Sequence, residues 1–147
     1  MKWISYLFAN YWRISGRVSR SDYWNIQVRF GIVPFITSFV TMIFLLNGSD
    51  LWLGLLPIWA ISSILLVVPL TALTVRRLHD TGHSGSWIGV SIGIQVLGRL
   101  AFAQLGDGVT YFLSFLQLMA GLYIFILTCL SGDPGPNQYG PDPIDAR

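Results

Sequence analysis

The sequence predicts an all-α integral membrane protein: a four-helix transmembrane bundle with an N-terminal interfacial helix and an irregular C-terminal tail. The first observation is composition, since 53% of the residues are hydrophobic and only 11% are charged, whereas a soluble domain carries about 25% charged residues. The second is that long stretches lack ionisable side chains, as the interior of a membrane requires. The third is that arginines stand at the ends of these stretches. A chain of this length is expected to form one domain, residues 1–147.

Four apolar segments are predicted to cross the membrane, at about residues 26–46, 51–75, 87–105 and 109–130. A hydrocarbon core of roughly 30 Å needs about 20 helical residues, so the first, second and fourth segments have ordinary spanning lengths. The third contains Arg99, which is close enough to the end of its helix for the guanidinium group to reach the lipid headgroups. The alternative for this third segment is a re-entrant or surface position.

The third segment and the residues just before it carry three glycines spaced four residues apart, Gly85, Gly89 and Gly93. Small residues at this spacing share one helix face and let a neighbouring helix approach closely, which favours van der Waals packing in lipid. We therefore expect segment 87–105 to pack inside the bundle through this glycine face.

Local signals predict where the helices begin and end. Residues 19–22 (SRSD) form a capping box, so the first helix is expected to start after Ser19, before its membrane portion. Gly82 is expected to end the second helix in a left-handed C-cap. Residues 47–50 (NGSD) and 106–108 (GDG) predict tight turns between the helices of each pair.

Two segments flank the predicted spans. Residues 1–18 mix aromatic with polar and basic side chains, a pattern typical of a short helix at headgroup level. Residues 131–147 are rich in proline and glycine and predict a tail without a continuous helix or strand.

The basic residues predict the orientation. With four spans, one membrane side receives eight of the nine basic residues: Lys2, Arg13, Arg17, Arg20, Arg29, Arg76, Arg77 and Arg147. The other side receives Arg99. Because cytoplasmic loops carry the excess of lysine and arginine, both termini are expected in the cytoplasm.

Two polar strings are predicted to meet on that side, at residues 16–24 (GRVSRSDYW) and 76–87 (RRLHDTGHSGSW). They approach because the first helix begins, and the second ends, at the same membrane face. The candidate polar cluster is Arg17, Arg20, Asp22, Arg76, Arg77, His79, Asp80 and His83. Asp80 stands at a helix C-terminus, where the macrodipole disfavours a negative charge. We expect it to pair with Arg17, Arg20 or Arg76.

The two strings resemble the GRxSRxx[YF]W and RRLHDxGxSGW motifs of the YhaH-like bacterial inner-membrane family, a domain of unknown function designated DUF805. Residues 132–143 (GDPGPNQYGPDP) are similar to that family's closing GxxGxNxYGxxP element. The resemblance runs from about Phe8 to Pro143 and departs at Ser86, where the family usually has a tryptophan. It implies a small multi-helix protein of the bacterial inner membrane, and brings no reaction, ligand or catalytic residue.

The cluster allows several chemical interpretations. His79 and His83 are four residues apart and could bind a metal on one helix, but Gly82 is expected to end the helix between them, so no metal site is expected. Residues 82–86 (GHSGS) lack the second glycine of a nucleophile elbow, which argues against a hydrolase. The arginines could bind a phosphate. We favour the remaining interpretation, in which arginine–aspartate pairs fix the helix register.

The leading hypothesis is a non-enzymatic membrane protein whose cluster anchors the bundle and contacts anionic lipid or a partner protein. Membrane lipids, a second copy or another membrane protein are the expected partners, and no cofactor is expected. A net charge of +2 is too small to indicate nucleic acid. One alternative is a small transporter or channel subunit, with Gln95 and Gln117 as a polar lining. The other is an enzyme acting on a lipid phosphate, with His79 or His83 as the acid or base.

Overall fold

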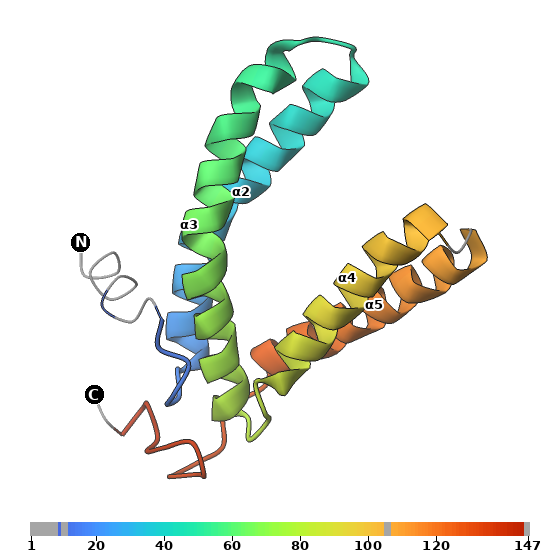
Figure 1. Cartoon of the computed structure of the whole chain (residues 1–147). Coiled ribbons are helices and arrows are strands. Elements are labelled where there is room, and N and C mark those ends of the chain that lie inside the picture. The colour runs from blue at the N-terminus through green and yellow to red at the C-terminus, as the bar shows by residue number, and fades with distance from the viewer. Residues whose placement is uncertain (1–8, 10–11, 105–106, 146–147) are drawn as a thin grey trace. The chain divides into compact units, whose positions relative to one another are not determined.

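The protein is described by a computed structural model that defines residues 9, 12–104 and 107–145 (Figure 1). These residues contain no strand, and their long helices are α2 (Arg20–Leu46), α3 (Leu51–Asp80), α4 (Ser86–Gln104) and α5 (Asp107–Cys129). The all-α prediction is therefore confirmed. Of these helices, α2, α3 and α5 are long and apolar enough to cross a membrane. The predicted interfacial helix over 1–18 falls largely on residues outside the described ranges.

The helix ends follow the signals in the sequence. Helix α2 starts directly after Ser19, the predicted N-cap. The turn between α2 and α3 contains Gly48 at a φ of 65°. Helix α3 ends at Asp80, and Gly82 follows it at a φ of 73°, the left-handed conformation expected of a C-cap glycine. The predicted turn at 106–108 overlaps residues that the structure does not describe.

The chain divides into two compact units, and the first contains the described residues of Ser21–Leu73. Here α2 and most of α3 form a helical hairpin (Figure 1). The indole Nε1 of Trp59 on α3 donates a hydrogen bond of 2.8 Å to Oγ of Ser38 on α2. This bond links the two helices within a stretch whose side chains are otherwise mainly apolar.

The second unit combines Ser15–Arg20 with Thr74–Arg147. In it, α4 and α5 run antiparallel and pack along each other (Figure 1). The last turns of α3, the short segment Ser15–Arg20 and the tail after α5 also belong to this unit. The candidate polar cluster, apart from Asp22, therefore lies within one compact part of the protein.

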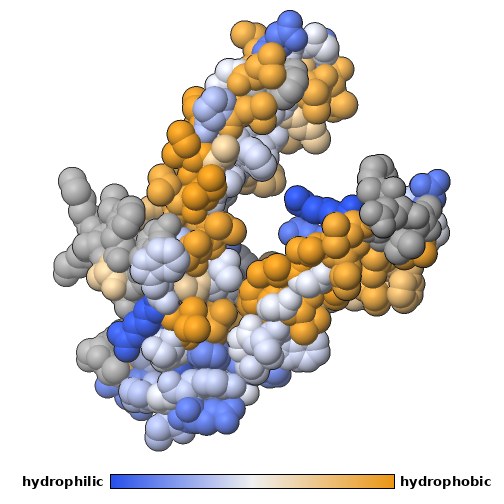
Figure 2. All heavy atoms as spheres, viewed as in Figure 1, coloured by the Kyte–Doolittle hydropathy of each residue, from blue (hydrophilic) through white to orange (hydrophobic). Residues whose placement is uncertain are grey.

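Large apolar side chains cover the outside of the helices in both units. Figure 2 colours much of the helical surface as hydrophobic, and exposed examples include Phe35, Ile64 and Phe112. Soluble monomers rarely expose contiguous apolar surface on this scale. The helices are therefore suited to a lipid environment.

The buried side chains of the second unit are an unusual mixture. Apolar residues and ionisable or hydroxyl groups are buried together, namely Val18, Ser19, Arg76, Arg77, Leu78, Asp80, Thr81, Leu127 and Thr128. A buried charge is costly unless it is paired and hydrogen-bonded. The arrangement of these polar groups therefore decides how this end of the molecule is held together.

The three glycines of the predicted face differ in how closely other atoms approach them. A Cβ added to Gly85 would lie 2.5 Å from Cγ1 of Val75, so this glycine allows a close approach to the end of α3. A Cβ added to Gly89 or Gly93 would meet no atom within 4 Å. Packing of another helix against Gly89 and Gly93 remains a prediction.

Candidate functional site

The ion pair between Arg17 and Asp80 lies at the centre of the polar cluster. Nε of Arg17 donates to Oδ1 of Asp80 at 2.9 Å, and both side chains are almost fully buried, at 1% and 4% exposure. The other two guanidinium nitrogens donate to the carbonyl oxygens of Asp133 and Gly135, each at 2.5 Å. One arginine thus joins the N-terminal segment to the end of α3 and to the tail.

Arg77 is the second cation paired with Asp80, and its side chain is completely buried. Its Nη1 donates to Oδ2 of Asp80 and lies 3.5 Å from the carbonyl oxygen of Val18. Its Nε and Nη2 donate to the carbonyl oxygens of Thr128 and Leu130. Arg77 therefore connects the end of α3 to the end of α5.

These contacts provide hydrogen-bond donors for carbonyl groups at the C-terminus of α5. The last carbonyl groups of a helix have no partner within it and carry the negative end of the macrodipole. Helix α5 has no basic residue in its own last turn. Arg77 and Arg20 supply the cations instead, because Nη1 of Arg20 donates to the carbonyl oxygen of Cys129 at 3.2 Å, between the two carbonyls bound by Arg77.

The tail is ordered by its contact with Asp80. The amide N–H of Asp133 donates to the backbone carbonyl of Asp80 at 2.7 Å. A Cβ added to Gly132 would collide with the Asp80 carboxylate, so only a glycine fits at this point. Over residues 131–145, the prediction that the tail has no continuous helix or strand is confirmed, and the backbone is nevertheless held by specific hydrogen bonds.

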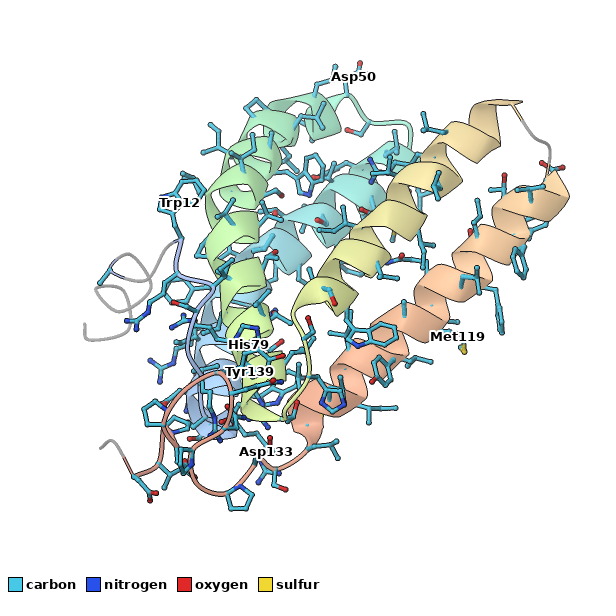
Figure 3. The ribbon with its side chains drawn as sticks, turned by 60° about the horizontal axis from the view of Figure 1, so that its bottom comes forward. Trp12, Asp50, His79, Met119, Asp133 and Tyr139 are labelled. Atoms are coloured by element: carbon cyan, nitrogen blue, oxygen red, sulfur yellow. The ribbon has the colours of Figure 1, made fainter. Side chains whose placement is uncertain are left out.

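His79 connects three chain segments through its ring and its backbone. The ring stacks on Tyr139 with centroids 3.9 Å apart and planes inclined by 1°, and Figure 3 shows the two side chains together. Its Nδ1 lies 3.2 Å from the carbonyl oxygen of Gly16. The side-chain amide of Asn137 donates to the His79 carbonyl at 2.9 Å. These contacts add the N-terminal segment and the tail to the same cluster.

His83 lies beyond the helix end and does not join this cluster. The N–H groups of His83 and Gly82 donate to the carbonyls of Leu78 and His79, the two hydrogen bonds of a Schellman C-cap. The His83 ring makes its own contacts, with Nδ1 2.5 Å from the Thr81 carbonyl. No group of three potential metal-ligating side chains occurs among the described residues.

Asp142 stabilises the last part of the tail. Its carboxylate accepts N–H bonds from Ile144 at 2.8 Å and Gly135 at 3.1 Å. The hydrogen bond from Ile144 is the main reason why the pKa of Asp142 lies below its ordinary value. This aspartate therefore acts as a charged acceptor for two backbone donors of the tail.

The structure brings together most, but not all, of the predicted site residues. Arg17, Arg77 and Asp80 form the ion-pair core, and His79 packs beside it. Arg77 is the second partner of Asp80, whereas Arg20 and Arg76 had been expected as alternatives to Arg17. Arg20 binds a carbonyl at the end of α5.

Of the remaining two predicted cluster residues, Arg76 is buried beside Arg77. The backbone carbonyl of Arg76 accepts from the Val18 N–H at 3.3 Å. Asp22 lies in the first turn of α2, in the other unit.

Sequence reasoning missed the contribution of the tail. Asp133, Asn137 and Tyr139 all contact the end of α3 or its neighbours, and the main acceptors for Arg17 are tail carbonyls. The signal was present in the glycine, asparagine and tyrosine positions of residues 132–143. Backbone acceptors leave no trace in side-chain identity, so these particular bonds could not be inferred.

The long apolar helices, and the buried polar cluster that joins the ends of α3 and α5, define a multi-pass membrane protein with an ion-paired core. Residues 11–141 match the family described as "Protein of unknown function (DUF805)", and the chain belongs to this family. The sequence-based recognition of the family is thus confirmed.

Two relatives from Escherichia coli strain K12 extend the comparison. The chain is 30% identical to "Inner membrane protein YhaI" over 144 residues, covering 97% of this chain and 96% of the relative. It is also 30% identical to "Inner membrane protein YhaH" over 153 residues, covering 97% of each chain. No solved structure matches the chain. The relatives and the apolar helices together support an inner-membrane location.

Proposed function

We propose that this protein is a non-enzymatic multi-pass protein of the bacterial inner membrane, whose Arg/His/Asp cluster is a structural anchor at the cytoplasmic face. The observation that carries this proposal is the saturation of Arg17 and Arg77. Each of their guanidinium nitrogens bonds to a protein acceptor, and the two side chains are 1% and 0% exposed. A phosphate could reach neither group without displacing these bonds.

The proposed architecture is a four-helix transmembrane bundle with both termini in the cytoplasm. Helices α2, α3 and α5 have the length and hydropathy of membrane spans. Helix α4 has 19 residues and is therefore about 28 Å long, close to the thickness of a hydrocarbon core. Eight of the nine basic residues fall on the same side as the two termini, and this excess supports a cytoplasmic location for that side.

The anchor joins segments that are distant in the sequence. The segment before α2, the end of α3, the end of α5 and the tail all bond to Arg17, Arg77 or Asp80. Because these side chains are buried, removal of one charge would leave another without compensation. We infer that the cluster fixes the cytoplasmic ends of the helices.

Arg20 is the member of the cluster best placed to contact a lipid headgroup or a partner. It is exposed, and its contact with the Cys129 carbonyl is longer than the bonds of Arg17. An exposed arginine next to an apolar helix can bind an anionic headgroup while its stem lies along apolar surface.

The proposed structural role extends to His79. Its ring is stacked on Tyr139 and its Nδ1 lies 3.2 Å from the Gly16 carbonyl, so the imidazole joins the tail to the N-terminal segment. These contacts support a role for His79 in the anchor.

The proposal is tested by replacing the three arginines with methionine, one at a time, in the full-length protein in mild detergent. Arg17→Met and Arg77→Met should lower the melting temperature by roughly 5–15 °C, because each leaves a buried aspartate under-compensated. Arg20→Met should keep the melting temperature and lose bound phosphatidylglycerol in native mass spectrometry. If Arg17→Met melts like wild type and loses the lipid instead, the cluster is a headgroup site and the anchor account fails.

A further inference from the structure

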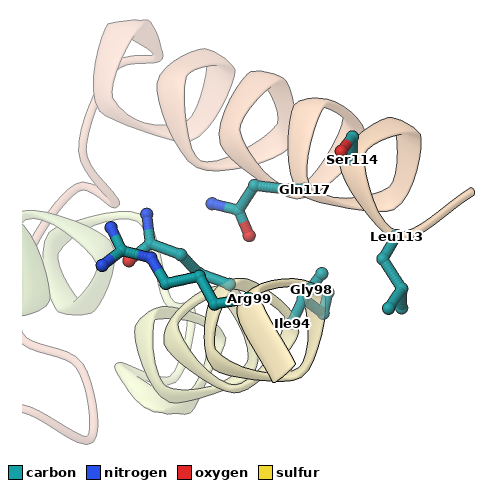
Figure 4. Close-up of a pocket in the computed structure, with 7 residues that line it drawn as sticks. Ile94, Gly98, Arg99, Leu113, Ser114 and Gln117 are labelled. Carbon is teal, nitrogen blue, oxygen red and sulfur yellow. The ribbon is translucent and has the colours of Figure 1, made fainter. Parts of the chain in front are cut away.

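A groove of about 520 Å³ runs between α4 and α5 of the second unit, away from the anchor. Its walls carry the polar side chains of Gln95 and Arg99 on α4 and of Ser114 and Gln117 on α5. Figure 4 shows Gln117 extending from α5 toward α4, with Arg99 on the opposite wall. The anchor does not use any of these groups.

Arg99 brings an uncompensated positive charge to this groove. It is exposed, and no aspartate among the described residues lies within ion-pairing distance of it. A cation on an apolar helix is costly unless an anion or water accompanies it. The residue is also the one basic side chain predicted to lie away from the cytoplasmic face.

Gln117 is the second residue of the groove whose hydrogen-bonding capacity is not fully used. Its Nε2 donates to Oγ of Ser91 at 3.0 Å, which fixes the side-chain amide. Its Oε1 is buried and has no hydrogen-bond partner among the described residues. A buried acceptor without a donor is unfavourable. A ligand in the groove cannot reach this buried atom, but it meets Arg99 and the exposed side chains of Gln95 and Ser114, which suit an anionic group and a hydroxyl group.

The surroundings of the groove favour an amphiphile. Part of the groove lining is apolar, from Ile94 of α4 and Leu113 of α5. An anion with an attached hydrocarbon chain can satisfy the polar groups and cover this surface together.

We propose that the α4–α5 groove binds the phosphoglycerol headgroup of an anionic membrane lipid. The phosphate pairs with Arg99 in charge-assisted hydrogen bonds. Gln95 and Ser114 provide further hydrogen-bonding groups on the two walls. The acyl chains lie along Ile94 and Leu113. The groove is thus a specific lipid site, separate from the headgroup contact proposed for Arg20.

The test uses the full-length Arg20→Gln variant, which removes the proposed headgroup contact at the cytoplasmic face. Protein in mild detergent is incubated with equal amounts of phosphatidylglycerol and phosphatidylcholine, and the retained lipid is measured by native mass spectrometry. Phosphatidylglycerol should be retained in preference. A further Arg99→Gln change should weaken its binding about tenfold or more, since a charge-assisted contact is lost.

Three further variants identify the contributing groups. Arg99→Lys should retain most of the preference, because the charge remains. Gln95→Leu should weaken phosphatidylglycerol binding, since a hydrogen-bonding group on the groove wall is removed. Arg13→Gln, which changes an exposed arginine outside the groove, serves as the matched control and should bind like its parent.

Two results would overturn the assignment. The first is equal retention of phosphatidylglycerol with and without Arg99→Gln. The second is binding of inorganic phosphate in phosphatidylcholine nanodiscs that depends on Arg99 while no phosphatidylglycerol is retained, which would make the groove a site for the free ion. Neither result involves Arg17 or Arg77, so neither would bear on the proposed structural anchor.

Discussion

Arg17 Nε and Asp80 Oδ1 are 2.9 Å apart, although the two residues are 63 positions apart in the sequence. The pair is buried, and Arg77 binds the other carboxylate oxygen. Asp80 also anchors the tail, because its backbone carbonyl accepts the Asp133 N–H. One aspartate therefore compensates two buried cations and positions the segment that follows α5.

Because the tail packs closely against Asp80, replacing Gly132 with alanine is predicted to destabilise the protein. Gly132→Ala would place a methyl group against the Asp80 carboxylate. We expect a loss of about 1–3 kcal/mol, as for overpacking in a dense site, measured by thermal unfolding in detergent. Gly121→Ala is the matched control, because a Cβ there meets nothing within 4 Å. Equal melting of the two variants would contradict the contact.

The stacking of Tyr139 on His79 predicts a difference between two substitutions. Tyr139→Ala should release the tail and increase its cleavage in limited proteolysis, with a loss of about 0.5–1.5 kcal/mol for the aromatic pair in addition to buried area. Tyr139→Phe keeps the ring and should resist cleavage like wild type. Protection of the alanine variant would mean that the stack does not hold the tail.

The glycines of α4 predict a test of the bundle. If another helix packs against Gly89 in the membrane, Gly89→Leu should force the helices apart and lower the melting temperature or the expression level. Gly121→Leu on α5 changes a glycine outside the predicted face and should be tolerated. Wild-type behaviour of both Gly89→Leu and Gly93→Leu would show that this face contacts lipid.

The orientation predicts which positions are reached from outside the cell. In a Cys129→Ser background, single cysteines replace Ser49, Ser84 and Gln138. A membrane-impermeant thiol reagent added to intact cells should label position 49 alone, because the other two are expected on the cytoplasmic side. Labelling at 84 from outside would reverse the proposed topology.

The sequence predicted the helices well because their ends carry specific signals. Ser19 precedes α2, and Gly48 and Gly82 adopt the positive φ values that turns and C-caps require. The pairing of Arg17 with Asp80 could also be anticipated, since a negative charge at a helix C-terminus needs compensation.

The rest of the cluster depends on tertiary structure that the sequence does not reveal. Arg77 reaches the carbonyls of Thr128 and Leu130, which any residue would present at those positions. The tail provides backbone acceptors for Arg17 in the same way. A proline- and glycine-rich segment predicts irregular backbone, but it does not predict which side chain that backbone will surround.

The most direct test of the structural anchor is a double-mutant cycle between Arg17 and Asp80, measured by reversible unfolding in detergent. Asp80→Ala alone should destabilise the protein by about 3–5 kcal/mol, because it leaves two buried arginines without their carboxylate. Adding Arg17→Ala should cost less than it does in the wild type, giving a coupling energy of about 1–3 kcal/mol. The same cycle with Arg20, which binds a carbonyl outside the ion-pair core, should show little coupling. Additive effects for Arg17 and Asp80, combined with loss of bound anionic lipid in the Arg17→Ala variant, would contradict the structural anchor.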